Sequence, residues 1–342
     1  MSPVYIYDPT AADALSKVRG IGRYLQILRE NFGDEFTFTS DLQDVPQHAT
    51  FVNPFFNFLQ PPLHLKKVCR RQIAVVHDLI PLKFPAHYPI GVKGNIYKNL
   101  NKAALKRYDT IITDSEHSKK DIIKILHIKP EKIKVVYPIL SQTFFSHTSK
   151  TPLFKLPANY CIYVGDATWN KNVVNIGRAI KKAHAYCVFV GKVFESEISE
   201  LNHPWQTEIK TFLQDNHDDP HFTFPGYITD NELTYLYENA YANLLVSRDE
   251  GFGYSYFEAG ALEVPSILAD IPVFHETAAE TALFADPENS DNIAKKIQEL
   301  MGNKDLRKKL AKDSQERTKL FTAELFKRNF KEAVEHNGYY EI

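Results

Sequence analysis

Short apolar runs alternate with longer amphipathic stretches along this chain of 342 residues. This alternation predicts parallel α/β units, because a helix must return the chain before the next buried strand can join the same sheet. In the first half we expect strands at 4–7, 73–76, 110–113 and 134–137 and helices at 21–31 and 96–107. In the second half we expect strands at 160–164, 186–190, 243–246 and 266–268 and helices at 173–183, 230–239, 254–263, 304–320 and 322–336.

The length favours two domains of ordinary size, and the composition is that of a globular protein, with 44% hydrophobic and 24% charged residues. A polar stretch at 141–152 follows Pro138 and is typical of a linker. We therefore expect an α/β protein with one Rossmann-like, doubly wound domain at 1–150 and a second at 151–320, followed by a C-terminal segment at 321–342. In such domains the ligand lies outside the carboxyl ends of the strands.

Three features predict a cytoplasmic location. No apolar run approaches the roughly 18 residues needed to span a bilayer. The first residues do not have the pattern of a signal peptide. Cys69, Cys161 and Cys187 lie far apart without CxxC spacing, so neither a disulfide framework nor a thiolate zinc site is expected.

The net charge of −1 conceals an asymmetry between the two halves. Residues 1–150 carry 21 lysines and arginines against 13 acidic residues, whereas the remainder carries 20 against 29. One stretch without acidic residues contains Lys93, Lys98, Lys102, Lys106 and Arg107. It suits a phosphorylated partner or an anionic membrane surface, and it equally suits a solvated helix face. A nucleic-acid binder is disfavoured, because a strong overall basic excess and a recognisable motif are both lacking.

Two glutamates, Glu250 and Glu258, stand on either side of the turn Gly251-Phe252-Gly253. A buried strand precedes this turn and a helix follows it, so backbone N–H groups and the positive end of the helix can face an anion. The flanking carboxylates can accept hydrogen bonds from the hydroxyls of a sugar and a ribose. The pattern therefore predicts part of a nucleotide-sugar site.

Other loops that follow strands contain further candidates. Lys171 lies near the start of a helix and is suited to offset the charge of a diphosphate. Tyr227 follows a strand-like stretch whose loop can flank a nucleotide base. His77 follows a buried strand and suits either a sugar contact or a structural role at the edge of the core. Gly22 and Arg23 lie in a Gly-x-Gly sequence that suits either a phosphate loop or an ordinary turn.

Several other sites are disfavoured. Leu25 stands where a dinucleotide fingerprint needs a third glycine, which argues against a nicotinamide-dependent dehydrogenase. The acidic cluster at 215–219 lies beside a proline in a polar segment and is better explained as a loop than as a metal site. No Asp-x-Asp follows an apolar strand, and no serine or cysteine nucleophile motif is present. Ser115 suits a helix N-cap as well as a ligand contact.

Residues 247–258 resemble the S-x-x-E-G-F-G-x-x-x-x-E element of the retaining glycosyltransferases of family 4, which have the two-domain GT-B fold. The similarity covers nearly the whole chain, because segments 20–24, 75–82, 113–118, 132–137 and 165–172 resemble the same family in order and position. The GIGRY and HDLIPL segments are most similar to members that build bacterial surface polysaccharides, including mannosyltransferases.

The resemblance implies a role for each matching residue of the second domain, which would bind the donor. Glu250 would hydrogen-bond the transferred sugar, and Glu258 would bind the ribose. The amides of Phe252 and Gly253 would meet the sugar or its phosphate, and Lys171 would meet the diphosphate.

The first domain would bind the acceptor. There His77 would approach the sugar, and Gly22 with Arg23 would line the cleft near the phosphates or the acceptor. The C-terminal helix within 321–342 would pack back on this first domain.

Two positions depart from the pattern of the family. Asn170 stands where the family commonly has an arginine before the loop lysine, and Ser255 stands where it often has a proline. Arg248 is a candidate to supply the missing positive charge to the donor diphosphate.

The resemblance implies transfer of a hexose, with mannose as one candidate, from a nucleoside diphosphate sugar with retention of configuration. The acceptor would be a saccharide or a polyprenyl-diphosphate-linked saccharide of a surface polysaccharide or glycoconjugate. The departing diphosphate would help to deprotonate the acceptor, without a metal or another cofactor. The protein would be cytoplasmic, and its basic first domain would suit contact with the inner membrane. A sugar-nucleotide epimerase or glycogen-type synthase on the same fold, and a non-catalytic partner subunit, remain as alternatives.

Overall fold

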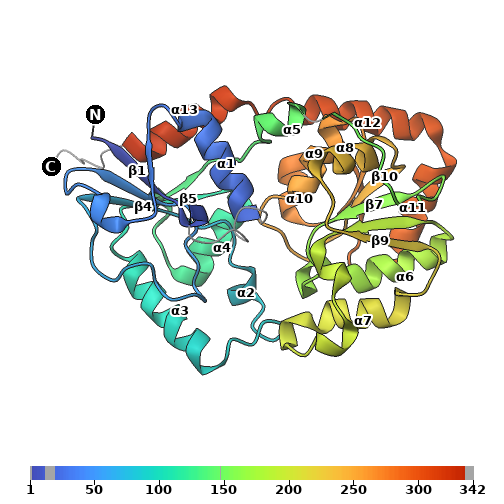
Figure 1. Cartoon of the computed structure of the whole chain (residues 1–342), viewed down its shortest axis with the longest axis horizontal. Coiled ribbons are helices and arrows are strands. Elements are labelled where there is room, and N and C mark those ends of the chain that lie inside the picture. The colour runs from blue at the N-terminus through green and yellow to red at the C-terminus, as the bar shows by residue number, and fades with distance from the viewer. Residues whose placement is uncertain (1, 12–19, 147, 336–342) are drawn as a thin grey trace. The chain divides into compact units, whose positions relative to one another are not determined.

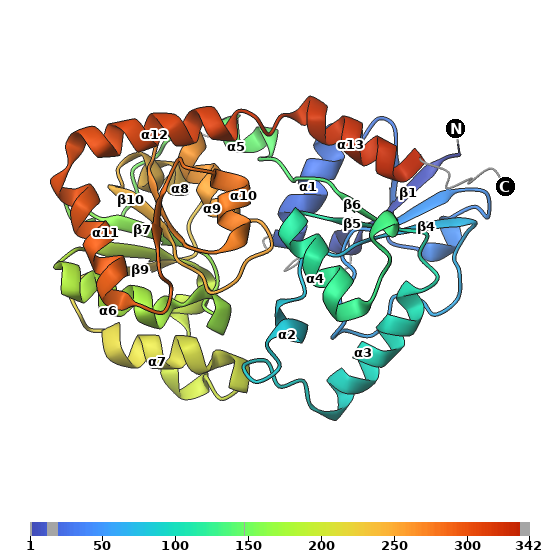
Figure 2. The same cartoon turned by 180° about the vertical axis from the view of Figure 1, so that it is seen from behind.

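The computed structural model describes residues 2–11, 20–146 and 148–335 (Figures 1 and 2). The chain divides into two compact units. Unit 1 consists of Met1–Pro85, Ile90–Gln142 and Phe321–Ile342, and unit 2 consists of Ala86–Pro89 and Thr143–Leu320. The short segment Ala86–Pro89 therefore belongs to unit 2, although both segments that flank it in the sequence belong to unit 1.

Unit 1 is built on a six-stranded parallel sheet in the order β2-β1-β3-β4-β5-β6. Its first strand lies between the second and the third, so the direction of winding reverses beside β1. The strands are β1 (Val4–Tyr7), β2 (Thr37–Thr39), β3 (Thr50–Asn53), β4 (Arg71–Val75), β5 (Thr110–Thr113) and β6 (Ile133–Val135). The α-helices are α1 (Gly20–Phe32), α2 (Ile80–Lys83), α3 (Gly91–Leu105), α4 (Glu116–Leu126) and α13 (Ala323–Glu335).

Unit 2 is built on a second six-stranded parallel sheet in the order β12-β11-β10-β7-β8-β9. Helices α6, α7 and α11 cover one face of this sheet, and α8, α9 and α12 cover the other (Figure 1). The strands are β7 (Cys161–Val164), β8 (Cys187–Val190), β9 (Phe222–Gly226), β10 (Ala242–Leu245), β11 (Ser266–Ala269) and β12 (Leu283–Ala285). The α-helices after α5 (Gln142–Ser146) are α6 (Val173–Ala183), α7 (Thr207–Asn216), α8 (Asp230–Glu238), α9 (Tyr254–Ala261), α10 (Pro272–Ala278), α11 (Ser290–Gly302) and α12 (Lys304–Thr318).

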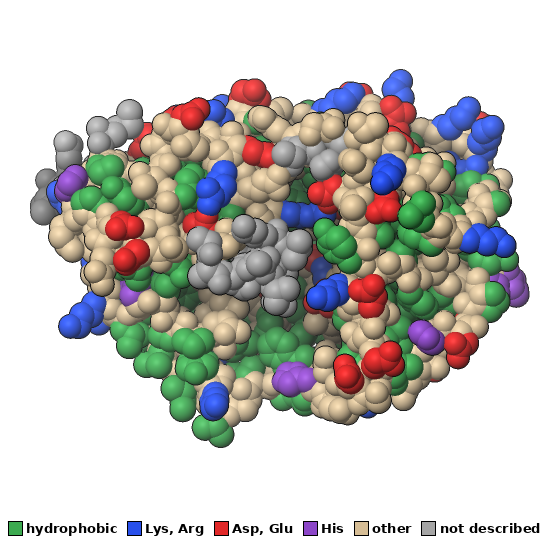
Figure 3. All heavy atoms as spheres, viewed as in Figure 1, with side chains coloured by type: hydrophobic (Ala, Val, Ile, Leu, Met, Phe, Trp, Pro, Cys, Tyr) green, Lys and Arg blue, Asp and Glu red, His purple; other side chains and the backbone are tan. Residues whose placement is uncertain are grey.

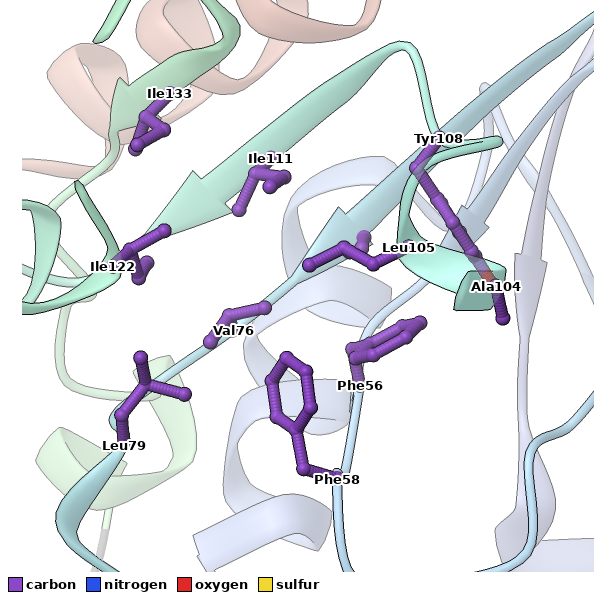
Figure 4. Packing of buried hydrophobic residues seen from close by; sticks show 11 residues of the cluster. Phe56, Phe58, Val76, Leu79, Ala104, Leu105, Tyr108, Ile111, Ile122 and Ile133 are labelled. Carbon is purple, nitrogen blue, oxygen red and sulfur yellow. The ribbon is translucent and has the colours of Figure 1, made fainter. Parts of the chain in front are cut away.

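A hydrophobic cluster of unit 1 fills the space between its sheet and the helices α3 and α4 (Figure 4). Leu105 of α3, Ile111 of β5 and Ile122 of α4 are all buried in it. Replacing such a buried leucine by alanine typically costs about 2–5 kcal/mol. The cluster contains Phe56, Phe58, Ala74, Val76, Leu79, Ala104, Leu105, Tyr108, Ile111, Ile122 and Ile133.

Helix α13 packs within unit 1 through aromatic side chains. The ring centroids of Phe326 and Phe330 lie 6.0 and 5.1 Å from that of Phe32 at the end of α1. Arg71 Nη2 donates a hydrogen bond to the carbonyl oxygen of Ala333 at 3.1 Å. The chain therefore returns to its first sheet after completing unit 2.

The periodicity of the sequence predicted most long elements and missed several short ones. The strands predicted at 4–7 and 110–113 coincide with β1 and β5, and the helix predicted at 173–183 coincides with α6. The strands β2 and β12 were not predicted, because each has only three residues at a sheet edge and leaves little periodic signal. The strand β3 and the helices α2, α7, α10 and α11 were also missed, and the predicted linker at 141–152 contains the short helix α5.

The packing of α9 on α12 provides a stability test. A Cβ added to Gly260 of α9 would lie 2.7 Å from Thr318 Cγ2 and 3.2 Å from the carbonyl oxygen of Ser314. Gly260→Ala should therefore lower the free energy of unfolding by about 1–3 kcal/mol, measured by urea denaturation. Gly302→Ala is the control, since its Cβ would meet nothing within 4 Å and should raise stability by about 0.5–1 kcal/mol. Equal stability of the two variants would contradict this packing.

Candidate functional site

Two loops of unit 2 meet where the strand order of its sheet reverses. β7 and β10 are hydrogen-bonded neighbours in the sheet although they are far apart in the sequence. The loop after β7 contains Lys171 and leads to α6, and the loop after β10 contains Glu250 and leads to α9. Doubly wound sheets bind their ligands at such a reversal.

A short ion pair joins these two loops. Lys171 Nζ lies 2.5 Å from Glu250 Oε1, and Ser247 Oγ donates to the same carboxylate oxygen at 2.8 Å. The Glu250 side chain is 9% exposed and the Lys171 side chain is 25% exposed. Because an ammonium group has three N–H donors, Lys171 can bind Glu250 and a phosphate oxygen at the same time.

Asn170 holds the two loops together beside this ion pair. Its side-chain Nδ2 donates to the carbonyl oxygen of Asp249 at 3.0 Å, and its backbone carbonyl oxygen accepts from the Arg248 N–H at 2.7 Å. The Tyr88 hydroxyl donates to Asn170 Oδ1 at 2.6 Å and accepts from the Asn170 N–H at 3.1 Å. Both Asn170 and Tyr88 are buried, so breaking these bonds would leave polar groups without water to replace their partners.

The segment that contains Tyr88 is seated in unit 2 by aromatic contacts. His87 stacks on Trp169 with ring centroids 3.8 Å apart, and Tyr88 meets Trp205 edge-on at 5.1 Å. Trp205 Nε1 donates to the carbonyl oxygen of Pro89 at 3.0 Å. These contacts fix the position of Tyr88 and, through it, that of Asn170.

Asn172 makes a second connection between the loops. Its backbone is left-handed, with φ 61°, a conformation that asparagine tolerates better than most residues. Its fully buried side chain donates from Nδ2 to the carbonyl oxygens of Val246 at 2.9 Å and Pro287 at 2.7 Å. Asn172 is also the N-cap residue of α6, so the residue that holds the adjacent loop directly precedes this helix.

Arg248 lies beside Asn170 in this network, but carboxylates balance its charge. Its Nε donates to Glu288 Oε1 at 2.9 Å, and its Nη1 donates to the Trp169 carbonyl oxygen at 2.6 Å and lies 3.4 Å from Glu208 Oε1. Burial raises the pKa of the Glu208 carboxyl, an effect that Arg248 opposes. The contact of Arg248 with the donor diphosphate stays a prediction.

The glycine turn adopts a backbone that a side chain would disturb. Gly253 has φ 93°, and a Cβ there would lie 2.6 Å from Phe274 Cε1. Phe252 is buried and stacks on Phe257 with ring centroids 4.4 Å apart. With Gly251, which is also buried, these residues form the predicted strand-to-helix turn between β10 and α9.

Glu258 and Tyr227 lie in contrasting environments. Glu258 is 2% exposed within α9, and its Oε2 accepts a hydrogen bond from the Tyr237 hydroxyl at 2.9 Å. Tyr227 follows the edge strand β9 and is 66% exposed. The contact of Glu258 with a ribose and that of Tyr227 with a base stay predictions.

In unit 1, both ring nitrogens of His77 have acceptors. Nδ1 lies 2.7 Å from Asp114 Oδ2, and Nε2 lies 3.0 Å from the carbonyl oxygen of Pro54. A carbonyl can only accept, so Nε2 carries a proton, and the carboxylate favours a second proton on Nδ1. Burial disfavours the protonated ring, but the charge and hydrogen bond of Asp114 outweigh it, so the pKa of His77 is raised.

The Gly-x-Gly sequence forms the start of α1 in unit 1. Gly22 is buried in the first turn of this helix, and Arg23 is half-buried. The ring of the next residue, Tyr24, lies 4.7 Å edge-on from that of His77, so two of the predicted segments come together. Contacts of Gly22 and Arg23 with phosphate or acceptor stay predictions. Ser115 is a helix N-cap, because its Oγ accepts from the Ser118 N–H at 3.0 Å.

Four residues that support the predicted site were not predicted from the sequence. Tyr88 lies 82 positions before Asn170, so no local pattern connects the two. Asp114 and Asn172 were visible only as polar residues after strands. Ser247 is the serine of the S-x-x-E pattern, which was a signal for its contact with Glu250.

The solved structures show which fold these two units form. HepE from Anabaena, crystallised with UDP-glucose, matches 98% of this chain and 100% of its own with a TM-score of 0.74 at 13% identity. The fold is therefore GT-B, and the predicted α/β class with parallel sheets is confirmed.

Sequence comparison identifies the family. The model of glycosyl transferases group 1 matches residues 146–317, which include both loops of unit 2. The chain belongs to this family, so the predicted family is confirmed.

Two bacterial relatives are similar over most of this chain. It is 31% identical over 230 residues to the O-antigen chain mannosyltransferase RfbU of Salmonella typhimurium, covering 66% of this chain and 60% of the relative. It is 23% identical over 247 residues to the O-antigen chain mannosyltransferase B of Escherichia coli, covering 69% and 63%. The chain thus spans less than two thirds of the length of each relative.

The His77–Asp114 pair should make the stability of unit 1 depend on pH. The pKa of His77 is raised above 6.5 in the folded state, so its contribution is fully present below pH 6.5 and is lost as the pH rises through the folded pKa. The urea midpoint of wild type should therefore exceed that of His77→Gln by more at pH 6 than at pH 9. His48→Gln, at an exposed position of the same unit, should show no such difference. A constant gap for His77→Gln would contradict the raised pKa.

Tyr88 should position the loop after β7 as well as stabilise it. Tyr88→Phe removes two buried hydrogen bonds to Asn170 and should cost about 1–3 kcal/mol. It should also weaken binding of whichever nucleoside diphosphate sugar stabilises wild type most in a thermal-shift screen. Tyr160→Phe, which removes a buried bond to the Leu236 carbonyl oxygen, should destabilise without changing that affinity. Equal donor affinities for the two variants would assign Tyr88 a structural role only.

Proposed function

We propose that this chain is a retaining hexosyltransferase that transfers mannose from a nucleoside diphosphate mannose to a saccharide acceptor during assembly of a bacterial surface polysaccharide. Its membership of the glycosyl transferases group 1 family supports the reaction class. The two relatives, both O-antigen chain mannosyltransferases, support the sugar and the product. HepE, a structure of the same fold crystallised with UDP-glucose, supports a nucleoside diphosphate sugar as the type of donor.

The ion pair between Lys171 and Glu250 is the observation that carries the proposed site. Its position beside the glycine turn suits a ligand with hydroxyls next to a diphosphate. Glu250 would accept hydrogen bonds from the hydroxyls of the sugar, and Lys171 would bind the diphosphate. The amides of Phe252 and Gly253 would contact the sugar or its phosphate, while Glu258 would hold the ribose.

The proposed chemistry is a same-face displacement at the anomeric carbon. The bond from this carbon to the diphosphate oxygen breaks while the acceptor oxygen bonds on the same face. The acceptor proton passes to an oxygen of the departing diphosphate, whose growing charge Lys171 and the turn amides stabilise. His77, with Gly22 and Arg23, would contact the sugar or the acceptor from unit 1. No metal ion takes part in this scheme.

The acceptor in this proposal is a saccharide or a polyprenyl-diphosphate-linked saccharide, and the reaction takes place at the cytoplasmic face of the inner membrane. None of the described helices is both long enough and apolar enough to cross a bilayer.

Turnover by variants of the ion pair tests the site. Lys171→Met and Glu250→Gln should each lower kcat/KM for mannosyl transfer by about 10²–10³. The first removes the charge that stabilises the departing diphosphate, and the second removes the carboxylate that positions the sugar and Lys171. Transfer would be measured with GDP-mannose and other nucleoside diphosphate sugars, and the anomeric configuration of the product would be read by NMR. An inverted product or preferred transfer of another sugar would contradict the corresponding part of the proposal.

A second Lys–Glu pair in unit 2 supplies the control. Lys296 and Glu299 lie 3.3 Å apart on α11, away from the two loops. Lys296→Met and Glu299→Gln should leave transfer within about two-fold of wild type, since exposed ion pairs contribute little. Wild-type rates in Lys171→Met and Glu250→Gln would contradict the assigned roles. Donor binding by wild type without transfer or hydrolysis would favour a non-catalytic subunit.

A further inference from the structure

The exposed hydrophobic side chains of unit 1 are concentrated at one helix. Val92 and Ile96 of α3 are 78% and 52% exposed, and Leu65 is 46% exposed. Arg107, which follows α3, donates from Nε to the carbonyl oxygen of Leu65 at 2.7 Å, so Leu65 lies at the end of the same helix. Among the described residues of unit 1, these three are the large hydrophobic side chains that are exposed.

The outward face of α3 carries an apolar stripe of Val92, Ile96 and Ala103, which the exposed Asn99 interrupts. With 100° between successive residues, Val92, Ile96 and Ala103 fall within about 40° of one another on the helix. All three are exposed, whereas the opposite side contains the buried residues Gly94, Asn101, Ala104 and Leu105. Space-filling atoms show hydrophobic side chains gathered over α3 in the lower left of Figure 3. An ordinary surface helix would place mostly polar side chains on this face, whereas here Val92 and Ile96 are exposed beside Asn99.

Basic residues flank this apolar stripe. Lys93 lies on one side of it, and Lys102 and Lys106 lie on the other. From residue 79 to residue 108 the chain contains no aspartate or glutamate, so nearby acidic residues of the helix do not neutralise these lysines. Long lysine side chains can keep their ammonium groups in water while their methylene groups cover apolar surface.

A basic depression of about 470 Å³ lies at the carboxyl end of α3. Asp109 is the acidic residue among those that line the depression. Both of its carboxylate oxygens lie 3.1 Å from Lys67 Nζ, and one of them accepts a hydrogen bond from the Gln72 N–H. The depression therefore has a strong excess of positive charge. Its lining consists of Lys66, Lys67, Lys106, Arg107, Tyr108, Asp109 and Lys132.

This surface is distinct from the part of unit 1 assigned to the sugar. Asp109 and Lys132 directly precede β5 and β6, at the amino ends of these parallel strands. His77 and Asp114 instead follow β4 and β5, at their carboxyl ends. A ligand on the basic depression therefore does not compete for the predicted cleft of the sheet.

We propose that the outward face of α3, together with the basic depression, docks this protein on a membrane surface that contains anionic lipids. The apolar stripe would enter the interface between headgroups and acyl chains, and the flanking lysines would meet lipid phosphates. A soluble phosphorylated ligand would account for the depression but not for the exposed Val92 and Ile96. This surface contains no residue of the proposed donor site, so loss of membrane docking and loss of sugar transfer can be distinguished.

Co-sedimentation of the full chain with vesicles tests this surface. Wild type should bind vesicles of phosphatidylcholine mixed with phosphatidylglycerol. It should bind vesicles of phosphatidylcholine alone much more weakly. Since one lysine near an anionic surface contributes about a factor of five, Lys93→Gln/Lys102→Gln/Lys106→Gln should lower the partition coefficient about 100-fold. Val92→Ser/Ile96→Ser should also weaken binding while leaving its dependence on salt concentration unchanged.

Matched variants separate a docking surface from general charge. Lys304→Gln/Lys308→Gln/Lys312→Gln removes three exposed lysines from α12 and should leave vesicle binding unchanged. Leu153→Ser is the apolar control, because Leu153 is 99% exposed elsewhere in the chain. Thermal unfolding of each variant would verify that it is folded.

Three results would overturn the proposal. The first is equal binding of wild type to vesicles with and without phosphatidylglycerol. The second is equal loss of binding in the α3 and α12 triple variants. The third is displacement from vesicles by inorganic phosphate beyond that caused by chloride at the same ionic strength, which would identify the depression as a site for free phosphate.

Discussion

The hydrogen bonds of two buried asparagines determine the geometry on which the candidate site depends. Asn170 and Asn172 connect the loop after β7 to backbone carbonyls of the loop after β10, at 3.0 and 2.9 Å. Because an unsatisfied buried amide costs about 1–3 kcal/mol, these hydrogen bonds hold the two loops in a fixed position relative to each other. Lys171 lies between the two asparagines in the sequence, so its ammonium is held against Glu250. Asn170, which stands where an arginine was expected, therefore helps to position Lys171 and adds no charge of its own.

In both sheets, candidate site residues from distant parts of the sequence meet at the carboxyl ends of the strands. Parallel strands place all their carboxyl ends at one edge, so residues that follow different strands meet there without being close in the sequence. His77 and Asp114 meet in this way in unit 1, as Lys171 and Glu250 do in unit 2. The amino ends of the strands lie at the opposite edge of the sheet. In unit 1 this edge lies beside the basic depression.

The sequence predicted the parallel α/β class, many of the elements and the loops that contain the candidate residues. Lys171 and Glu250 could each be assigned to a site because each follows a strand, and glycines mark the second loop. Their direct contact could not be predicted, because it requires β7 and β10 to be neighbours in the sheet. Tyr88 could not be found either, since its partner Asn170 lies 82 positions further along the chain.

The sequence by itself determined the family, through the spacing of Ser247, Glu250, the glycines and Glu258, since this spacing is local and survives in a one-dimensional pattern. Only the tertiary structure decided how the charges are used. It placed the Arg248 guanidinium beside the carboxylates of Glu208 and Glu288, and it brought the Tyr88 hydroxyl to Asn170, next to Lys171. The physical reason is that charge balance and burial depend on neighbours in space, and strand order brings those neighbours from distant parts of the chain.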